Sequence, residues 1–566
     1  MTLPLVAFSI ALLPLYFAIR WPFFSLALHR DTGFYVSNST ICSGRISFHK
    51  GWNATYAGCS KVLPEFFYSL IYLWHGGGDK YKFYSRFYYT LYSYPIAILI
   101  GYLAYMMEGS AVAFYAGAVI FVLLSSEPHY GTYFESGEQF ELLPQVAGFA
   151  AMYAGMTSGQ PWMVGAGVGV WVLESLFVKL SSLPAAVILA LGTGYLAPAS
   201  MVYSIGFSLL AIVLYLVWLW YNGKNIRDLL RPMIGHELYS GHTLSLESYV
   251  DRIISKVAFL LFICFSHPII PILAMVGSLA NRGNVLNTLF YLIGISIPFT
   301  LALDHWSWLV GRRKRMVVVL YFLALGAGLI PSLASLTWDI NDTKTVLLTL
   351  YLCGVFVCYI IQAARVWYYS LPFLPIIALL ATSGVMALVE MGTAGWAMCF
   401  GLLVLWGIIN GWRSYAMNLE QRERWTWLPH RVTPDKNVAL NDIVPQLRET
   451  IGKDTVLIYG LYNQGYVLLE TSYPVAMIAP SLYLNLMHPE WQKELHERMA
   501  EGPPTFILDS DKSFDLHEVE EKTGLRYQLR REFDCGFTLF ALSGMAERTC
   551  CIGLDHSSPG TTLPVH

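Results

Sequence analysis

The chain has 566 residues, of which 55% are hydrophobic and only 13% are charged. Soluble domains carry about 25% charged residues, so this composition excludes an ordinary soluble enzyme. The formal net charge of −2 offers no basic excess for binding nucleic acid, and the partners must be sought in the membrane instead.

Apolar runs of about 17 to 25 residues predict membrane-spanning helices, because that length crosses a hydrocarbon core of ~30 Å. The first run lacks a positively charged start and a small-residue cleavage site, so we interpret it as a retained span rather than a signal peptide. About thirteen runs of this length occur, near residues 3–20, 84–107, 110–127, 139–156, 162–180, 183–200, 203–222, 256–278, 285–303, 315–334, 346–363, 371–390 and 394–412. We therefore expect a polytopic α-helical membrane protein with a transmembrane domain over residues 1–412.

The first polar loop, predicted over residues 20–83, contains the run Asp31-Thr32-Gly33-Phe34-Tyr35. Residues 64–74 in this loop are aromatic and apolar but too short to cross a membrane, and three glycines follow at 76–78. This pattern predicts a helix lying in the membrane interface. From spacing alone, a helix-capping or solvated role is the simpler interpretation of Asp31.

Beyond residue 412 charged residues become frequent and apolar runs become short. Helical spacing at 441–451 and 489–500 alternates with strand patterns at 455–459, 505–508 and 537–542. These patterns predict a soluble α/β domain over residues 413–566 with a frayed tail. An odd number of spans puts this domain and the first loop on the outer face. The cluster Arg312-Arg313-Lys314-Arg315 would then also lie outside, against the tendency of Lys and Arg to stay cytoplasmic, so the spans around 256–334 stay open.

A family resemblance begins in the first loop. Asp31 and Tyr35, followed by Lys61-Val62-Leu63-Pro64-Glu65-Phe66-Phe67-Tyr68, resemble the pattern of polyprenyl-phosphate-dependent membrane glycosyltransferases, the superfamily of protein O-mannosyltransferases and lipid A aminoarabinose transferases. In that pattern an Asp-Glu pair precedes the Tyr, and here Thr32 stands where the Glu is usual. Further segments that resemble the family contain Arg86, Glu138, Lys179, Asn222, Arg365 and Tyr369.

The resemblance implies a GT-C-type fold and an inverting glycosyltransferase. Such an enzyme moves a sugar from a polyprenyl-phosphate donor in the membrane lipid to an extracytoplasmic hydroxyl acceptor on a protein, lipid A or a glycan. Asp31 is then expected to be the general base, and Glu138 to orient the acceptor or the sugar. The remaining roles are donor-phosphate binding by Lys179, Arg86 and Arg365, and substrate binding by Tyr35, Lys61, Asn222 and Tyr369.

The resemblance also implies an integral, multi-pass protein of a bacterial or archaeal cell membrane, with its active site on the extracytoplasmic side. Glu174, inside a predicted span, is a candidate buried partner for Lys179. Charged side chains at span ends also reach for lipid headgroups, so this structural role competes with the functional one for Arg86 and Lys179.

We expect no cofactor and no metal site. The nine cysteines form no Cys-x-x-Cys pair, and the first loop has no Asp-x-Asp pair, although two carboxylates and phosphate oxygens can together hold a divalent cation. Two other classes stay open: a polytopic transporter with an appended soluble domain, and a membrane sensor. A transporter predicts internal repeats and ionisable residues near span midpoints, whereas this chain has no evident repeat and its charges gather at span ends.

Overall fold

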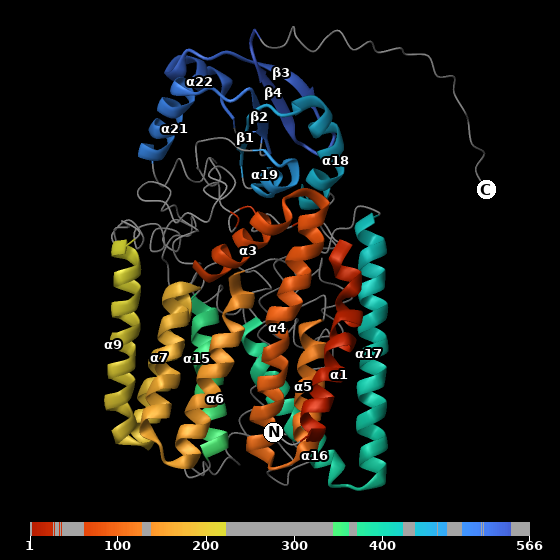
Figure 1. Cartoon of the computed structure of the whole chain (residues 1–566), viewed down its shortest axis with the longest axis vertical. Helices are drawn as coiled ribbons and strands as arrows, with labels where there is room; N and C mark the ends of the chain where they lie inside the picture. The colour runs from red at the N-terminus through yellow and green to blue at the C-terminus, as the bar shows by residue number, and fades with distance from the viewer. Residues whose placement is uncertain are drawn as a thin grey trace, which may run out of the picture.

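The computed structural model describes residues 3–25, 28, 33, 36, 62–126, 137–221, 343–361, 371–422, 436–460, 462–471, 489–510, 512 and 514–544. In this part the chain is mostly helical, with one small sheet near the C-terminus. Long helices run side by side in a bundle, and the sheet with its helices covers one end of that bundle (Figure 1). We call this end the capped end and the opposite one the far end.

The bundle consists of apolar helices that run up and down between the two ends. They are α1 (Leu3–Arg20), α4 (Gly78–Glu108), α5 (Ala111–Ser125), α6 (Leu142–Ser158), α7 (Pro161–Phe177), α8 (Leu183–Leu196), α9 (Pro198–Tyr221), α15 (Thr343–Ile361), α16 (Leu374–Val389) and α17 (Thr393–Arg422). Short helical turns lie next to three of them: η1 (Trp21–Ser25), η3 (Gly137–Phe140) and η4 (Leu180–Ser182). Helix α3 (Val62–His75), near the predicted interfacial helix, crosses the capped end at an angle to the bundle (Figure 1).

Four segments in the described part are long and apolar enough to cross a membrane: Leu3–Phe24, Gly78–Glu108, Pro198–Tyr221 and Leu371–Val389. Other predicted spans coincide with shorter helices. α6 and α7 have 17 residues each and α8 has 14, which correspond to about 21–26 Å, less than the ~30 Å hydrocarbon core. The spans predicted near 256–278, 285–303 and 315–334 lie outside the described residues, so the full number of spans stays a prediction.

Glycines end two of the helices at the far end. α4 ends at Gly109 and α6 at Gly159, both with φ of 67°, a left-handed conformation that favours glycine. The next helix follows each glycine within two residues. The Ser110 hydroxyl caps the start of α5 by accepting a hydrogen bond from Val112 N, and Pro161 is the first residue of α7. These short turns make α5 antiparallel to α4 and α7 antiparallel to α6, so α5 and α7 end at the capped end.

Glycines also allow α6 and α7 to pack backbone to backbone. A Cβ at Gly148 would lie 2.7 Å from the Gly167 carbonyl oxygen, and one at Gly167 would lie 2.3 Å from the Gly148 carbonyl oxygen. On another face of α7, a Cβ at Gly165 would lie 2.4 Å from the Tyr203 Cβ of α9. Small residues at such contacts allow membrane helices to approach closely, which places α7 between α6 and α9.

We expect Gly167→Ala to destabilise the protein by about 1–3 kcal/mol, because the added methyl group overlaps the α6 backbone. Gly206→Ala on α9 is the matched control, since nothing in the described chain lies within 4 Å of a Cβ built there. Unfolding of the detergent-purified variants measures the difference. Equal stability of the two variants would contradict the close α6–α7 contact.

The cap contains a four-stranded sheet with the order β1-β2-β4-β3. Its strands are β1 (Val456–Tyr459), β2 (Phe506–Asp509), β3 (Tyr527–Glu532) and β4 (Thr538–Leu542). β1 and β2 are parallel with Val456 opposite Phe506, whereas β4 pairs antiparallel with both β2 and β3. The helices are α18 (Lys436–Ile451), α19 (Gln464–Leu469), α21 (Pro489–Glu501) and α22 (Leu516–Thr523). The three predicted strands correspond to β1, β2 and β4, and the sequence did not predict β3.

The cap and the capped end share one apolar core. A single cluster of buried side chains includes Tyr68 of α3, Tyr81 of α4, Leu457 of β1 and Ile507 of β2. Helix α19 also contacts α4, and a Cβ at Gly77 would lie 2.2 Å from the Val467 carbonyl oxygen. The cap is therefore seated directly on the start of α4.

One buried histidine makes the cap sensitive to pH. His496 of α21 is 8% exposed, and burial lowers its pKa from the ordinary value of about 6.5. The folded cap then binds this proton less readily than the unfolded chain. Neutral His496 therefore stabilises the cap at pH values above the pKa that this histidine has in the unfolded chain. This stabilisation is lost as the pH falls through the lower pKa that it has in the folded cap.

We therefore expect amide hydrogen exchange in α21, corrected for intrinsic rates, to accelerate from about pH 7 to about pH 5. The substitution His496→Gln should remove this acceleration, and the same substitution at the exposed neighbour His517 should leave it. A pH profile unchanged in His496→Gln would contradict this assignment.

Candidate functional site

Two of the predicted site residues, Arg86 and Lys179, are described with their side chains. Arg86 lies in the third turn of α4, which starts at the capped end, and Lys179 directly follows α7, which ends there (Figure 1). Glu138 lies in η3, and its side chain is outside the described part. The other predicted site residues are outside the described residues: Asp31, Tyr35, Lys61, Asn222, Arg365 and Tyr369. The predicted first loop starts where α1 ends, at Arg20, and it contains α3, which begins at Val62; both points lie at the capped end.

Lys179 lies beside two buried carboxylates. Its Nζ is 4.0 Å from Glu141 Oε1, and these side chains are 13% and 3% exposed. Glu174, in the last turn of α7, accepts hydrogen bonds from the Ser182 hydroxyl, with distances of 3.1 and 2.9 Å to its two oxygens. Gln145 Nε2 donates to Glu141 Oε2 at 3.3 Å. We call Glu141, Gln145, Glu174, Lys179 and Ser182 the carboxylate cluster.

A break between α7 and α8 brings these residues together. α7 ends at Phe177, and Lys179 has an extended backbone with φ of −159° before the η4 turn starts. This turn returns Ser182 to Glu174, while Glu141 and Gln145 lie four residues apart at the start of α6, on one face. The sequence suggested Glu174 as a buried partner of Lys179. In the structure Lys179 interacts electrostatically with Glu174, and the Glu141 carboxylate, which the sequence did not suggest, also lies at ion-pair distance.

The cavity inside the carboxylate cluster is small. Its volume is about 10 Å³, and Glu141, Gln145, Trp171 and Ser182 are among its lining residues. Such a volume holds about one water molecule and is too small for a phosphate group or a sugar ring. The partly exposed side of Lys179 is therefore the part of the cluster that a larger ligand can reach.

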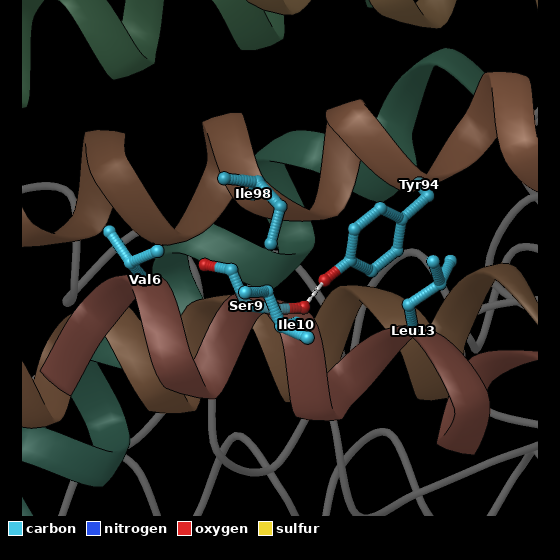
Figure 2. A pocket seen from close by; sticks show the side chains of 6 residues that line it. All are labelled: Val6, Ser9, Ile10, Leu13, Tyr94 and Ile98. Carbon is cyan, nitrogen blue, oxygen red and sulfur yellow. Dashed lines mark hydrogen bonds between the residues drawn. The ribbon is translucent and has the colours of Figure 1, made fainter. Parts of the chain in front are cut away.

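A larger groove of about 280 Å³ lies between α1 and α4 (Figure 2). Its lining residues are Val6, Ser9, Ile10, Leu13, Tyr94 and Ile98, none of which is charged. The Tyr94 hydroxyl donates a hydrogen bond to the Ser9 carbonyl oxygen. This lining offers no charged group for acid–base chemistry or for binding a phosphate.

A buried arginine lies at the end of α1. Arg20 is 2% exposed, and its Nη1 donates to the Tyr16 hydroxyl at 2.8 Å. Its guanidinium carbon lies 5.1 Å from the centroid of the Tyr89 ring. The Tyr16 hydroxyl is also hydrogen-bonded to Ser93 Oγ at 2.8 Å and Ser125 Oγ at 3.1 Å. Polar and aromatic partners thus stabilise a cation inside the apolar bundle.

Arg86 connects α4 to the start of the first loop. The side chain is 3% exposed, and its Nη1 donates to the Phe24 carbonyl oxygen at 3.4 Å. Phe24 belongs to η1, the turn that precedes Asp31 in the chain. In this structure Arg86 therefore holds the segment that leads into the predicted catalytic loop.

Aromatic rings lie between the arginines and the carboxylate cluster. The Tyr92 hydroxyl donates to the Phe140 carbonyl oxygen at 3.2 Å, and the Phe140 ring centroid lies 4.8 Å from that of Tyr92 and 6.0 Å from that of Tyr89. Phe140 directly precedes Glu141, and Tyr89 stacks under Arg20. Arg20 and the carboxylate cluster are thus separated by a layer of aromatic rings at the capped end.

The sequence analysis selected Glu138 as a site residue and did not select Glu141, Gln145 or Arg20. A signal was present, because ionisable residues at the ends of apolar helices are candidates for function. Arg20 ends the first span and Glu141 precedes α6. Spacing could not show that both side chains are buried.

No group of three or more His, Cys, Asp and Glu residues is placed to hold a metal ion among the described residues. In comparisons with known proteins, no family model and no curated protein matches this chain. Its function is therefore inferred from the chemistry of the capped end.

We expect Lys179→Met to destabilise the protein by about 3–5 kcal/mol, because the buried carboxylates of Glu141 and Glu174 lose their neighbouring cation. Adding Glu141→Gln should restore part of this stability, since the amide keeps the shape and removes one charge. The unfolding midpoints of the single and double variants measure this coupling.

The control is Lys493→Met, which removes an ion pair with Glu497 whose side chains are 80% and 61% exposed. Such a surface pair contributes little, so this variant should resemble the wild type. Strictly additive effects of Lys179→Met and Glu141→Gln would show that the two charges do not interact.

Proposed function

We propose that the chain is an inverting glycosyltransferase that moves a sugar from a polyprenyl-phosphate donor to an extracytoplasmic hydroxyl acceptor. The observation that carries this proposal is the position of the buried charges. Five ionisable groups lie at or near helix ends: Arg20 ends α1, Arg86 is in the third turn of α4, Glu141 precedes α6, Glu174 is in the last turn of α7 and Lys179 follows α7. These helix ends are at the capped end (Figure 1), where the first loop starts and finishes. Charges buried in an apolar bundle are expensive, and their concentration at one end favours a functional role there.

The proposed reaction is a single displacement. The acceptor oxygen bonds to the anomeric carbon of the sugar as the bond from that carbon to the phosphate oxygen breaks, so the configuration inverts. Asp31 accepts the proton of the acceptor hydroxyl, and the polyprenyl phosphate leaves with the electron pair of the broken bond. Glu138 orients the acceptor or the sugar.

Cations stabilise the negative charge that develops on the leaving phosphate, most strongly where water is partly excluded. Lys179, Arg86 and Arg365 have this role in the proposal. Lys179 is the best supported, because its side chain is 13% exposed and reachable from outside the cluster. The residues proposed to contact the substrates are Tyr35, Lys61, Asn222 and Tyr369.

The proposed function also requires one orientation of the protein in the membrane. The chain is a GT-C-type protein of about thirteen spans, and its capped end faces the extracytoplasmic side of a bacterial or archaeal cell membrane. The first loop over residues 20–83 and the domain over residues 413–566 then meet the acceptor, while the lipid of the donor stays in the outer leaflet. This chemistry uses a base and cations, without a cofactor.

A transporter is the second candidate, because the break between α7 and α8 lies next to the buried carboxylate of Glu174. Interrupted helices with ionisable groups are typical of transporter binding sites. Reconstitution into liposomes separates the two functions. Ion-coupled solute uptake that depends on Glu174, with no sugar transfer, would favour the transporter.

We expect Asp31→Asn to lower the transfer rate by about 10²- to 10⁴-fold, because the amide keeps the shape of the side chain but cannot accept the proton. Labelled polyprenyl-phosphate sugars and membranes containing each variant measure the transfer. Asp79→Asn is the matched control, since Asp79 is 86% exposed and pairs with Lys82 at 2.8 Å. Full activity of Asp31→Asn would exclude this residue as the base.

A further inference from the structure

The turn between β1 and α19 lies directly against the first loop. A Cβ at Gly33 would lie 2.1 Å from the carbonyl carbon of Asn463 and 2.3 Å from the backbone nitrogen of Gln464. Only glycine permits such an approach, because any side chain would overlap the backbone of the cap. Gly33 belongs to the run Asp31–Tyr35 of the first loop, so the cap contacts the loop that contains the predicted catalytic base.

Asn463 in this turn is buried without using its amide. The side chain is 1% exposed, and neither its Oδ1 nor its Nδ2 has a hydrogen-bond partner in the part of the chain that the structure describes. It stands at the N-cap of α19, where asparagine usually accepts a backbone hydrogen bond, yet it makes no such bond. A buried amide without partners costs free energy, so this one calls for an explanation.

Its polar neighbours on the same edge of the sheet are occupied. Asp509 ends β2, and its Oδ2 accepts a hydrogen bond from Phe514 N at 3.1 Å. The Ser510 hydroxyl donates to the Tyr459 carbonyl oxygen at 3.1 Å. β1 and β2 are parallel, and open α/β sheets bind ligands outside the carboxyl ends of their parallel strands. Asn463 thus presents an amide without a hydrogen-bond partner in the described chain at the edge of the sheet where such a ligand is expected.

We propose that Asn463 binds the hydroxyl groups of the donor sugar from the cap side of the first loop. A carboxamide offers two donors and one acceptor oxygen, which match adjacent hydroxyls of a pyranose or furanose. This inference rests on the proposed function and extends it, because it assigns recognition of the sugar to the cap and recognition of the phosphate to the bundle. Asn463 is a binding residue and takes no part in the proton transfer.

Two substitutions test this role. Asn463→Leu keeps the approximate shape and removes the amide, and Asn463→Ser is a smaller change that serves if the leucine variant does not fold. Gln446→Leu is the matched control, since Gln446 of α18 is an exposed amide. The probes are polyprenyl-phosphate mannose, polyprenyl-phosphate aminoarabinose and bare polyprenyl phosphate, each titrated into the full-length protein in detergent.

We expect Asn463→Leu to bind at least one sugar-linked probe about 10- to 100-fold more weakly than the wild type does. Binding of bare polyprenyl phosphate should not change, because that ligand has no sugar. The ligand-free variant should unfold at the same or a higher temperature, since an unpartnered buried amide has been removed. Gln446→Leu should behave as the wild type with all three probes.

Three results would overturn the assignment: equal affinity of the wild type and the variant for the sugar-linked probes, binding of none of these probes, or a large loss of stability in both ligand-free variants, Asn463→Leu and Asn463→Ser. That last result would show that the amide supports the fold. Failure of the proposed function looks different. In that case the sugar-linked probes bind in an Asn463-dependent manner, yet no transfer that depends on Asp31 occurs.

Discussion

Lys179 and the carboxyl groups of Glu141 and Glu174 are shielded from water inside an apolar bundle, where each ionisable group must find a polar partner. An unpaired charge in such a place costs several kcal/mol, so the local structure is arranged around this need. The break between α7 and α8 brings the Ser182 hydroxyl to Glu174, and Arg20 meets the same need with tyrosine rings and hydroxyls. These arrangements occur beneath the cap, which makes the capped end the place to look for chemistry.

Elements with a strong local pattern could be predicted from the sequence. β1 and β2 are fully buried along their length, so their apolar runs stand out from charged surroundings. β3 could not be predicted, because Tyr527 alone is buried and the other residues of this edge strand are exposed. The number of spans was uncertain for a physical reason, since α6 and α7 are apolar but short, and composition does not fix length.

The candidate site depends on contacts between distant parts of the chain, and these could be predicted only in part. Residue type and position at a span end selected Arg86 and Lys179, which the structure places near the start of α4 and after the end of α7; their role in binding phosphate stays a prediction. Spacing favoured Glu138 and could not show that Glu141 is the carboxylate beside Lys179. Asn463 carries no sequence signal, because an asparagine in a turn is ordinary and only its burial against Gly33 makes it unusual.

The central claim is that one lipid-linked sugar binds between the first loop, the cap and the buried cations. A structure determined by cryo-electron microscopy with a non-hydrolysable polyprenyl-phosphonate sugar tests this most directly. We expect the sugar ring beside Asp31 and the β1–α19 turn, with the phosphonate next to Lys179 or Arg86. A ligand bound at the far end, near the ion pair of Glu108 and Lys344, would contradict the claim.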